Sequence, residues 1–473
     1  MAARRYLHPA LFFVVAFVLR FVAARLFAGE PVWDGHYYDF GARRIAEGHG
    51  YSDDRVVNGV TEWHPWCHYP VGYSAFLALF YVVLGSKAWV AQLANSLTGA
   101  LVVVVVYELA RATFTTHARA VAAGVVAALH PGMVLYGALV MGEMLAALTV
   151  MGAFLVTLRL RASHRPLVAI GGGAIVLGLG ALVRPQALLC APFLALAIED
   201  RSWRSRAVAA AVGSAMSLAP VLPWSARNCA VMDGCALVST NAGWNLAIGS
   251  FPRATGRFET LRSSDGCREV TGQVQQDRCW LHYGIANVTA APGRWLALVP
   301  AKLSFTFDHE SFQVEYLREA RPSAWPEERR VRWRQVTSTM HRLLVVAMPL
   351  AFVALVRRRG LGLYVQAGLA LAAVAAGWLG MSAGTPIVWP LVVAGCALPL
   401  VPLPGRPRAE PALLFCVVLV ASTALTHAVF FGEDRYHVVT SPALCLLAAA
   451  MLRPANTRGA DTRGVRAAGE SSS

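Results

Sequence analysis

The chain has 473 residues, of which 56% are hydrophobic and only 15% are charged, and its mean hydropathy is +0.49. This composition is too apolar for a soluble globular protein. The net charge of +15 comes from arginines in short clusters between apolar runs. That pattern is typical of the cytoplasmic loops of membrane proteins and argues against nucleic-acid binding.

The first apolar stretch, residues 9–28, contains Arg20 and Arg25. These charges and the lack of a clean small-residue cleavage site predict a retained first membrane helix rather than a cleaved signal. A polar, aromatic-rich segment follows at residues 29–69. With the N-terminus inside, this segment is the first outer loop.

The next apolar run, residues 71–84, is short for a membrane span, which needs roughly 20 residues. If it does not cross, the helix at about 88–110 returns to the cytoplasm, and all later arginine clusters also fall inside, as the charge bias requires. The clusters are Arg111 and Arg119; Arg159, Arg161 and Arg165; Arg201, Arg204 and Arg206; Arg357–Arg359; and Arg406 and Arg408.

We therefore predict an all-α polytopic membrane protein of about twelve transmembrane helices, with both termini cytoplasmic and outer loops forming the active-site face. Glycines at 171–173, 178 and 180 indicate close helix packing. The expected organisation is an N-terminal transmembrane module (1–224), an extracytoplasmic region (225–340), C-terminal transmembrane helices (341–453) and a disordered cytoplasmic tail (454–473).

The nine cysteines include no CxxC pair, so a zinc or thioredoxin-like motif has no support. Four of them share the polar region after residue 225. If that region is extracytoplasmic, Cys229–Cys235 and Cys267–Cys279 are candidate disulfides, with other pairings open. Four others lie in apolar helices and are expected to be buried: Cys190, Cys396, Cys416 and Cys445.

Charged residues are nearly absent from the middle of the apolar runs, whereas an ion-coupled transporter usually needs them there. They collect at the expected outer ends and loops. Carboxylates there can act as general bases, and cations can neutralise a phosphate. The alternative is that outer loops simply tolerate charge. The candidates are Asp34, Asp39, Glu47, Glu143, Arg184, Arg227, Lys302 and Arg435.

Asp34 stands among aromatic residues just beyond the first helix. Partial desolvation there would raise its pKa towards that of a general base. Equally, Asp34 is placed to cap a membrane-parallel helix over residues 37–48. Lys302 is one of only two lysines in the chain, so it is either a specific phosphate contact or incidental.

Aromatic residues crowd the first outer loop, where they can stack on sugar rings or form an interfacial belt. His36, His64 and His68 lie among them, but nothing in their spacing fixes a metal geometry. No cofactor is required by the sequence, and a divalent metal remains open. The aromatic residues are Trp33, Tyr37, Tyr38, Tyr51, Trp63, Trp66, Tyr69 and Tyr73.

The ordered motifs resemble the bacterial branch of the protein O-mannosyltransferase and aminoarabinose-transferase superfamily, the GT-C glycosyltransferases (glycosyltransferase family 39-like). Six further segments follow the motif that begins Asp34-Gly35-His36-Tyr37-Tyr38. They are His68-Tyr69-Pro70-Val71-Gly72-Tyr73, Gly142-Glu143, Arg184-Pro185-Gln186, the stretch from Pro223 through Asn241-Ala242-Gly243-Trp244-Asn245, and Lys302-Leu303 with Glu433-Asp434-Arg435-Tyr436-His437.

The resemblance implies inverting transfer of a sugar from a polyprenyl-phosphate donor to an acceptor on the outer face of a bacterial inner membrane. It implies Asp34 as the base and Glu143 as a second acid. Arg184, Lys302 and Arg435 become candidates for the donor phosphate. The candidate sugar or acceptor contacts are His36, Tyr37, Tyr73 and Asn241.

Two departures from the family's motifs limit what the resemblance implies for this chain. Gly35 follows Asp34 where some family members carry Glu, and Tyr69-Pro70 replaces the usual double proline. Whether Asp34 or Asp39 is the base stays open, as does the acceptor, which is a lipid, a glycan or a protein. The alternative function is a flippase or transporter of lipid-linked sugars, which shares the apolar bulk but needs polar groups across the membrane depth.

Overall fold

The computed structural model describes residues 2–162, 164–198, 202–354, 361–382, 388–395, 410–450 and 452. Helices supply nearly all the regular structure there, and the one sheet in these ranges has two strands. The predicted helical class is confirmed. The arginines Arg201, Arg357–Arg359, Arg406 and Arg408, Cys396 and the tail from residue 454 lie outside the described residues.

The first outer segment is structured. It contains a short helix and a β-hairpin whose turn, Asn58-Gly59, has positive φ at both residues (51° and 80°), as a tight Asn-Gly hairpin requires. The elements in chain order are α1 (Ala2–Phe27), α2 (Asp34–Ala46), β1 (Ser52–Val57), β2 (Val60–Pro65) and α3 (Val71–Leu84).

Helix α3 has 14 residues, bounded by Pro70 and by Gly85 at a φ of 81°. At 1.5 Å per residue it is about 21 Å long, shorter than the roughly 30 Å hydrocarbon core. This agrees with the expectation that residues 71–84 do not cross the membrane.

The apolar body follows α3. Its elements are α4 (Ala88–Thr113), α5 (His117–Leu129), α6 (Pro131–Leu135), η1 (Tyr136–Ala138), α7 (Glu143–Arg161), α8 (Pro166–Val183), η2 (Pro185–Ala197), α9 (Trp203–Leu218) and α10 (Val221–Val231). The glycines of α8 allow close packing, because a Cβ on Gly173 would meet Ala153 and Thr157 of α7, and one on Gly178 would meet Ser217 of α9.

After α10 the chain forms a small apolar core that includes Phe251 and Trp280, whereas Phe307, Phe312 and Leu317 further along pack into the main apolar core. The expected disulfides Cys229–Cys235 and Cys267–Cys279 are both present. The elements are α11 (Ala242–Ser250), η3 (Ser263–Asp265), η4 (Cys267–Glu269), α12 (Gln273–Ala290), α13 (Pro292–Ala297), α14 (Val299–Phe307), α15 (Phe312–Ala320) and η5 (Pro322–Ala324).

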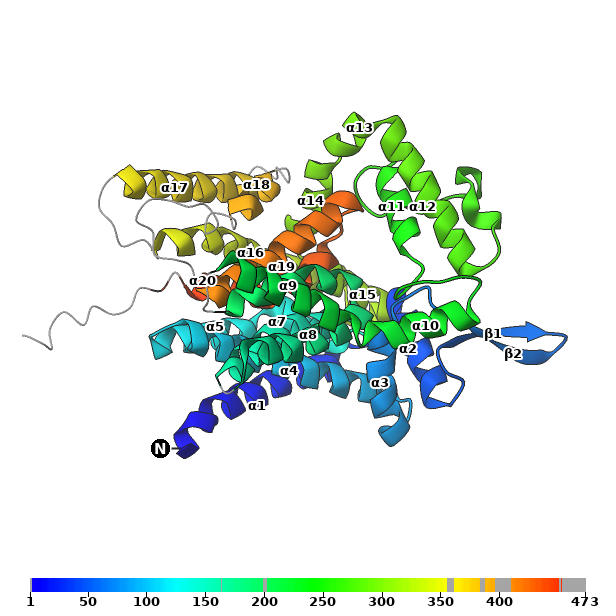
Figure 1. Ribbon diagram of the computed structural model, residues 1–473, viewed down its shortest axis with the longest axis horizontal. Helices are drawn as coiled ribbons and strands as arrows, with labels where there is room; N and C mark the ends of the chain where they lie inside the picture. The colour runs from blue at the N-terminus through cyan, green and yellow to red at the C-terminus, as the bar shows by residue number, and fades with distance from the viewer. Residues whose placement is uncertain are drawn as a thin grey trace, which may run out of the picture.

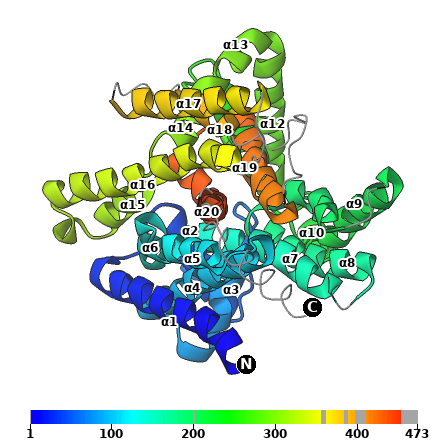
Figure 2. The ribbon, with the colours of Figure 1, turned by 90° about the vertical axis from the view of Figure 1, so that its left-hand side faces the viewer.

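The last elements return to the apolar body, and α20 lies at its centre (Figure 2). Cys190, Cys416 and Cys445 are buried thiols, as expected. The elements are α16 (Glu327–Ala354), α17 (Leu361–Ser382), α18 (Val388–Ala394), α19 (Pro411–Val429), η7 (Asp434–Thr440) and α20 (Ser441–Ala449).

Within the described ranges, five helices are long and apolar enough to cross a membrane, or seven if two bent helix pairs each count as one span. The chain is therefore an integral membrane protein, although these residues do not reach the expected count of about twelve. The five are His8–Phe27, Ala88–Thr113, Glu143–Arg161, Pro166–Val183 and Pro411–Val429, and the bent pairs are α5 with α6–η1 and α9 with α10.

Figure 1 shows how these spans position the site. The long helices run across the view, with the N-terminus towards the left. The β1–β2 hairpin and helices α10, α11 and α12 gather at the right-hand end. The two segments expected on the outer face thus lie at one end of the apolar body.

Candidate active site

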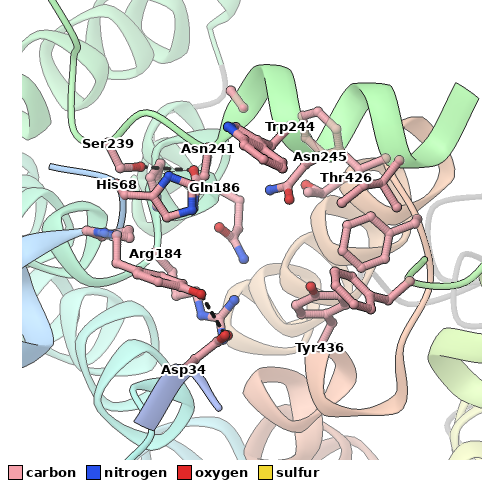
Figure 3. Close-up of a pocket in the computed structure, with 18 of the residues that line it drawn as sticks. Asp34, His68, Arg184, Gln186, Ser239, Asn241, Trp244, Asn245, Thr426 and Tyr436 are labelled. Atoms are coloured by element: carbon pink, nitrogen blue, oxygen red, sulfur yellow. Dashed lines mark hydrogen bonds between the residues drawn. The ribbon is translucent and has the colours of Figure 1, made fainter. Parts of the chain in front are cut away.

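A cavity of about 600 Å³ lies where these outer segments meet the helix ends. Its lining comes from distant parts of the chain, as Figure 3 shows. The polar members are Asp34 and Tyr38 of α2, His68 and Tyr69 before α3, Arg184 and Gln186 at the α8–η2 junction, Ser239, Asn241 and Asn245 around the start of α11, Glu259 and Thr260 before η3, Arg268 of η4, Thr426 and His427 near the end of α19, and Arg435 and Tyr436 of η7.

Asp34 is the first residue of α2, and Trp33 precedes it with a φ of 51°. The N-cap position of α2 is Trp33 and not Asp34, so the N-cap alternative is wrong. One carboxylate oxygen accepts a hydrogen bond from the Tyr69 hydroxyl at 2.8 Å, and the other pairs with the Arg435 guanidinium at 2.5 Å. Asp34 therefore faces the cavity with both oxygens engaged.

The charge state of Asp34 differs from the expected one. Burial by itself would raise the pKa of this carboxyl, but the Arg435 guanidinium and the Tyr69 hydroxyl together hold the pKa below its ordinary value. The expectation of a raised pKa is wrong for this state of the site. Asp34 is an ionised, already paired carboxylate.

Arg435 is the centre of the charge network in the cavity. It also pairs with the Glu433 carboxylate at 2.7 Å and donates to the Tyr436 hydroxyl at 3.1 Å. Its guanidinium lies 5.2 Å from the centre of the Phe312 ring. Burial raises the pKa of Glu433 despite the charge of Arg435, so the two acids beside this arginine differ in proton affinity.

Glu143 and Arg184 form a second ion pair behind the cavity wall. Glu143 is the first residue of α7, as predicted, and is fully buried. Arg184 ends α8 and lines the cavity, with its guanidinium 5.6 Å from the centre of the Tyr436 ring. Glu143 itself does not line the cavity, so it can act on a substrate only through Arg184.

Of the expected sugar or acceptor contacts, only Asn241 lines the cavity, where its side-chain oxygen accepts from Ser239 at 3.0 Å. His36 and Tyr37 are exposed on α2 outside it. Tyr73 is buried in α3 and donates to Asn95 at 2.8 Å. The motif resemblance could not separate these positions, because it does not show which way a helix faces.

Lys302 is fully buried in α14 and is not part of the cavity lining. Its ammonium donates to the carbonyl oxygens of Ala428 and Val429, at 3.4 and 3.1 Å, at the C-terminal end of α19. Burial, with a smaller contribution from Arg294, lowers the pKa of Lys302 to about 8. This geometry corrects the expectation of a phosphate contact, because the side chain is used as a helix C-terminal cap.

Sequence reasoning did not single out Arg268, which lines the cavity beside Trp244. Its guanidinium donates to the Leu261 carbonyl at 2.8 Å, and no ion pair with a carboxylate is found for it among the described residues. The signal that could have found it is its position directly after Cys267, which a disulfide fixes. Asp39, the alternative base, is buried against Tyr81 and Arg43 and does not line the cavity.

His36, His64 and His68 do not gather around one point. His68 lines the cavity, and burial holds its pKa below the ordinary value although Asp34 opposes this shift. His64 is half exposed in β2 and lies 3.6 Å from Glu62. No metal-binding group of three side chains in the described ranges includes any of these histidines.

Residues 68–226 match the family model of dolichyl-phosphate-mannose-protein mannosyltransferases. This match confirms the resemblance to that GT-C family over about a third of the chain. It includes the junction that carries Arg184 and ends before the outer region that supplies Asn241 and Arg268. No curated protein sequence matches the chain.

Solved structures of low sequence identity also align with the chain. They include an oligosaccharyltransferase of Archaeoglobus fulgidus tethered to an acceptor peptide (13% identity, TM-score 0.45, covering 94% of this chain and 49% of that one). Another is ArnT of Cupriavidus metallidurans bound to undecaprenyl phosphate (15% identity, TM-score 0.37, covering 93% of this chain and 74% of that one). The chain spans about half the length of the archaeal protein.

Proposed function

We propose that this protein is a glycosyltransferase that moves a sugar from a polyprenyl-phosphate donor to an acceptor at the extracytoplasmic face of a bacterial inner membrane. The main observation behind this proposal is the Asp34–Arg435 pair in the cavity, which places a carboxylate beside a cation. A base for the acceptor and a counter-charge for the leaving phosphate are the two groups that this transfer needs.

Three arginines of the lining suit the donor phosphate: Arg184, Arg268 and Arg435. Arg184 is balanced by Glu143, and Arg435 by Asp34 and Glu433. Arg268 brings a cation without a carboxylate partner among the described residues. The donor is a phosphodiester with one negative charge, which would therefore be attracted to the side of the cavity nearest Arg268, and guanidinium groups suit its pair of free oxygens.

The apolar part of the lining suits the lipid carrier. Leu188 and Leu189 of η2 and Phe430 after α19 line the same cavity as the arginines. Leu189 is 43% exposed, so the wall continues onto the outer surface of the helix bundle. An isoprenoid chain can lie there while its phosphate reaches the guanidinium groups.

In the proposed reaction, an acceptor hydroxyl or amine attacks the anomeric carbon from the face opposite the phosphate. The bond from the anomeric carbon to the phosphate oxygen breaks, and its electron pair stays on the phosphate, releasing polyprenyl phosphate. The acceptor proton passes to Asp34. Donor binding draws Arg435 towards the phosphate, which frees a carboxylate oxygen of Asp34 and lets its pKa rise towards that of a working base.

The test is release of free polyprenyl phosphate, measured by mass spectrometry, from purified protein in lipid vesicles with a panel of polyprenyl-phosphate sugars. Asp34→Asn should lower release by about 10²–10⁴-fold. Asp54→Asn is the matched control, because Asp54 is an exposed β1 residue paired with Arg44 at 3.2 Å. Asp39→Asn tests the alternative base.

Near-full release by Asp34→Asn would remove the assignment of the base. No release by folded wild-type protein with several donors and acceptors would favour the flippase alternative. Orientation has its own test. Reporter fusions at Asn58, in the hairpin turn, and at Arg165, between α7 and α8, should lie on opposite sides of the membrane.

A further inference from the structure

A second cluster of ionisable side chains lies inside the protein, apart from the cavity lining. It consists of Glu310 between α14 and α15, His341 of α16 and His437 of η7, and all three are fully buried. One potential ligand atom from each lies within 4.8 Å of the others. The mechanism proposed above uses none of them.

Backbone carbonyls fix the orientation of both histidine rings. His341 contacts the Phe307 carbonyl oxygen through Nε2 at 2.9 Å, and His437 contacts the Thr306 carbonyl oxygen through Nδ1 at 2.6 Å. A carbonyl only accepts hydrogen bonds, so these ring nitrogens carry the hydrogens. The opposite nitrogens, Nδ1 of His341 and Nε2 of His437, then present lone pairs in the neutral rings.

The two rings are stacked with their centres 3.8 Å apart, and both nitrogens lie near the same carboxylate oxygen. Oε2 of Glu310 lies 3.2 Å from Nε2 of His437 and 4.0 Å from Nδ1 of His341. Oε1 of Glu310 is held separately by the Gln313 side-chain amide at 2.7 Å. A single proton can join Glu310 to His437, but it leaves Nδ1 of His341 buried without a hydrogen-bond partner. A metal ion satisfies all three atoms.

The surrounding backbone is shaped around this carboxylate. A Cβ on Gly132 of α6 would lie 1.4 Å from Oε1 of Glu310, so a larger residue there would displace the acid. His130, just before Gly132, faces the same acid with Nε2 at 4.0 Å. Its Nδ1 accepts from the Met133 amide at 3.3 Å, so Nε2 carries the hydrogen in the neutral ring and His130 is not a ligand in this arrangement.

We propose that Glu310, His341 and His437 form a divalent transition-metal site, with Zn²⁺ as the ion that best fits two imidazoles and one carboxylate. Tetrahedral zinc has bonds of about 2.0–2.2 Å to such ligands, and each ring is usually held by a second hydrogen bond, as the carbonyls do here. Ligand atoms around such an ion are roughly 3.3 Å apart. The 3.2 Å contact fits this spacing, and the 4.0 Å contact requires a small side-chain shift.

A metal at this site would affect the cavity by holding the neighbouring segments in place. His437 follows Arg435 by two residues in η7. Asp434 fixes the same segment by accepting from the amides of Ser311 and Phe312. A metal bound through His437 would tie η7 to α16 and to the α14–α15 connection, and so hold Arg435 towards Asp34. These are positioning residues.

The experiment measures metal binding directly on full-length protein in detergent after removal of metal with a chelator. Zn²⁺ is titrated in competition with a chromophoric chelator, and Co²⁺ is added separately to record its visible absorption. We expect one Zn²⁺ per chain and an intense tetrahedral Co²⁺ spectrum. His341→Gln and Gly132→Ala should weaken Zn²⁺ binding at least tenfold, whereas His64→Gln, at a half-exposed histidine of β2, should leave it unchanged.

Wild-type protein that binds no Zn²⁺ would overturn the proposal, as would His341→Gln protein with wild-type stoichiometry and affinity. If the variants do not fold, X-ray absorption of the wild-type zinc complex decides. Two imidazole nitrogens and a carboxylate oxygen at about 2.0–2.2 Å support the site, and any other ligand set refutes it. None of these outcomes depends on glycosyltransferase activity.

Discussion

Asp34 and Arg435 are 401 residues apart in the sequence, yet their side chains form a 2.5 Å ion pair in the cavity wall. The pair joins the first turn of α2 to η7, just before the last described helix. Each partner sets the charge state of the other, because burial would otherwise raise the pKa of the acid. Without a bound donor, Asp34 is therefore an ionised carboxylate whose pairing with Arg435 keeps it from taking a proton.

Removing the arginine should change the pH dependence of the reaction. In Arg435→Gln, burial of Asp34 is no longer opposed by its main cationic partner, so its pKa rises. A base must be ionised in the free enzyme, so the acid limb of kcat/KM should move to higher pH than in the wild type. A pH profile of polyprenyl-phosphate release checks this, and an unmoved limb would show that Asp34 is not the titrating base.

Glu143 should be needed mainly for stability and for Arg184. Its side chain is fully buried against a guanidinium that is 15% exposed, and breaking such a pair costs about 3–5 kcal/mol. Glu143→Gln should lower the thermal unfolding temperature in detergent, and the double variant Glu143→Gln/Arg184→Met should recover part of the loss. Additive losses in this double-mutant cycle would show that the pair is not coupled.

Substitutions at Lys302 and Arg268 should have opposite effects: the first should lower stability, and the second should weaken donor binding. Lys302→Met removes the cap of α19, so stability should fall by about 1–2 kcal/mol while the KM for the donor stays the same. Arg268→Gln should do the reverse, raising the donor KM by about tenfold or more if its charge-assisted contact to phosphate is worth about 1.5–3 kcal/mol. If both variants raised the donor KM equally, Lys302 would have to contact the donor after all.

The Cys267–Cys279 disulfide should support Arg268, which directly follows its first cysteine. It joins residues 12 apart, and replacing both cysteines by serine should cost about 2–3 kcal/mol and raise the donor KM. The control is the same change at Cys229 and Cys235, a pair separated by six residues and not adjacent in sequence to a cavity arginine. A larger KM effect in the control would contradict the role given to Arg268.

Several features could be predicted because their signals are local. The bounds of α3 and the start of α7 at Glu143 follow from apolar runs and charge. The two disulfides were candidates among other possible pairings in one polar region, and the structure contains both. The β1–β2 hairpin, which the sequence analysis did not predict, also has a local signal in Asn58-Gly59 between residues that form strands.

The rest depends on tertiary packing, which a single sequence does not show. Lys302 was notable because lysine is rare in the chain, but rarity does not show where an ammonium points, and the structure places it against the end of α19. Glu310, His341 and His437 lie on three separate segments with no motif spacing between them. Only folding brings such residues together.

The wide sequence separation of Asp34 and Arg435 also has a consequence for biosynthesis. Because synthesis runs from the N-terminus to the C-terminus, Asp34 leaves the ribosome 401 residues before its cationic partner. During that interval the half-built chain holds the acid without its counter-charge. A nascent product that stops short of Arg435 therefore lacks the charge pair on which the proposed transfer depends.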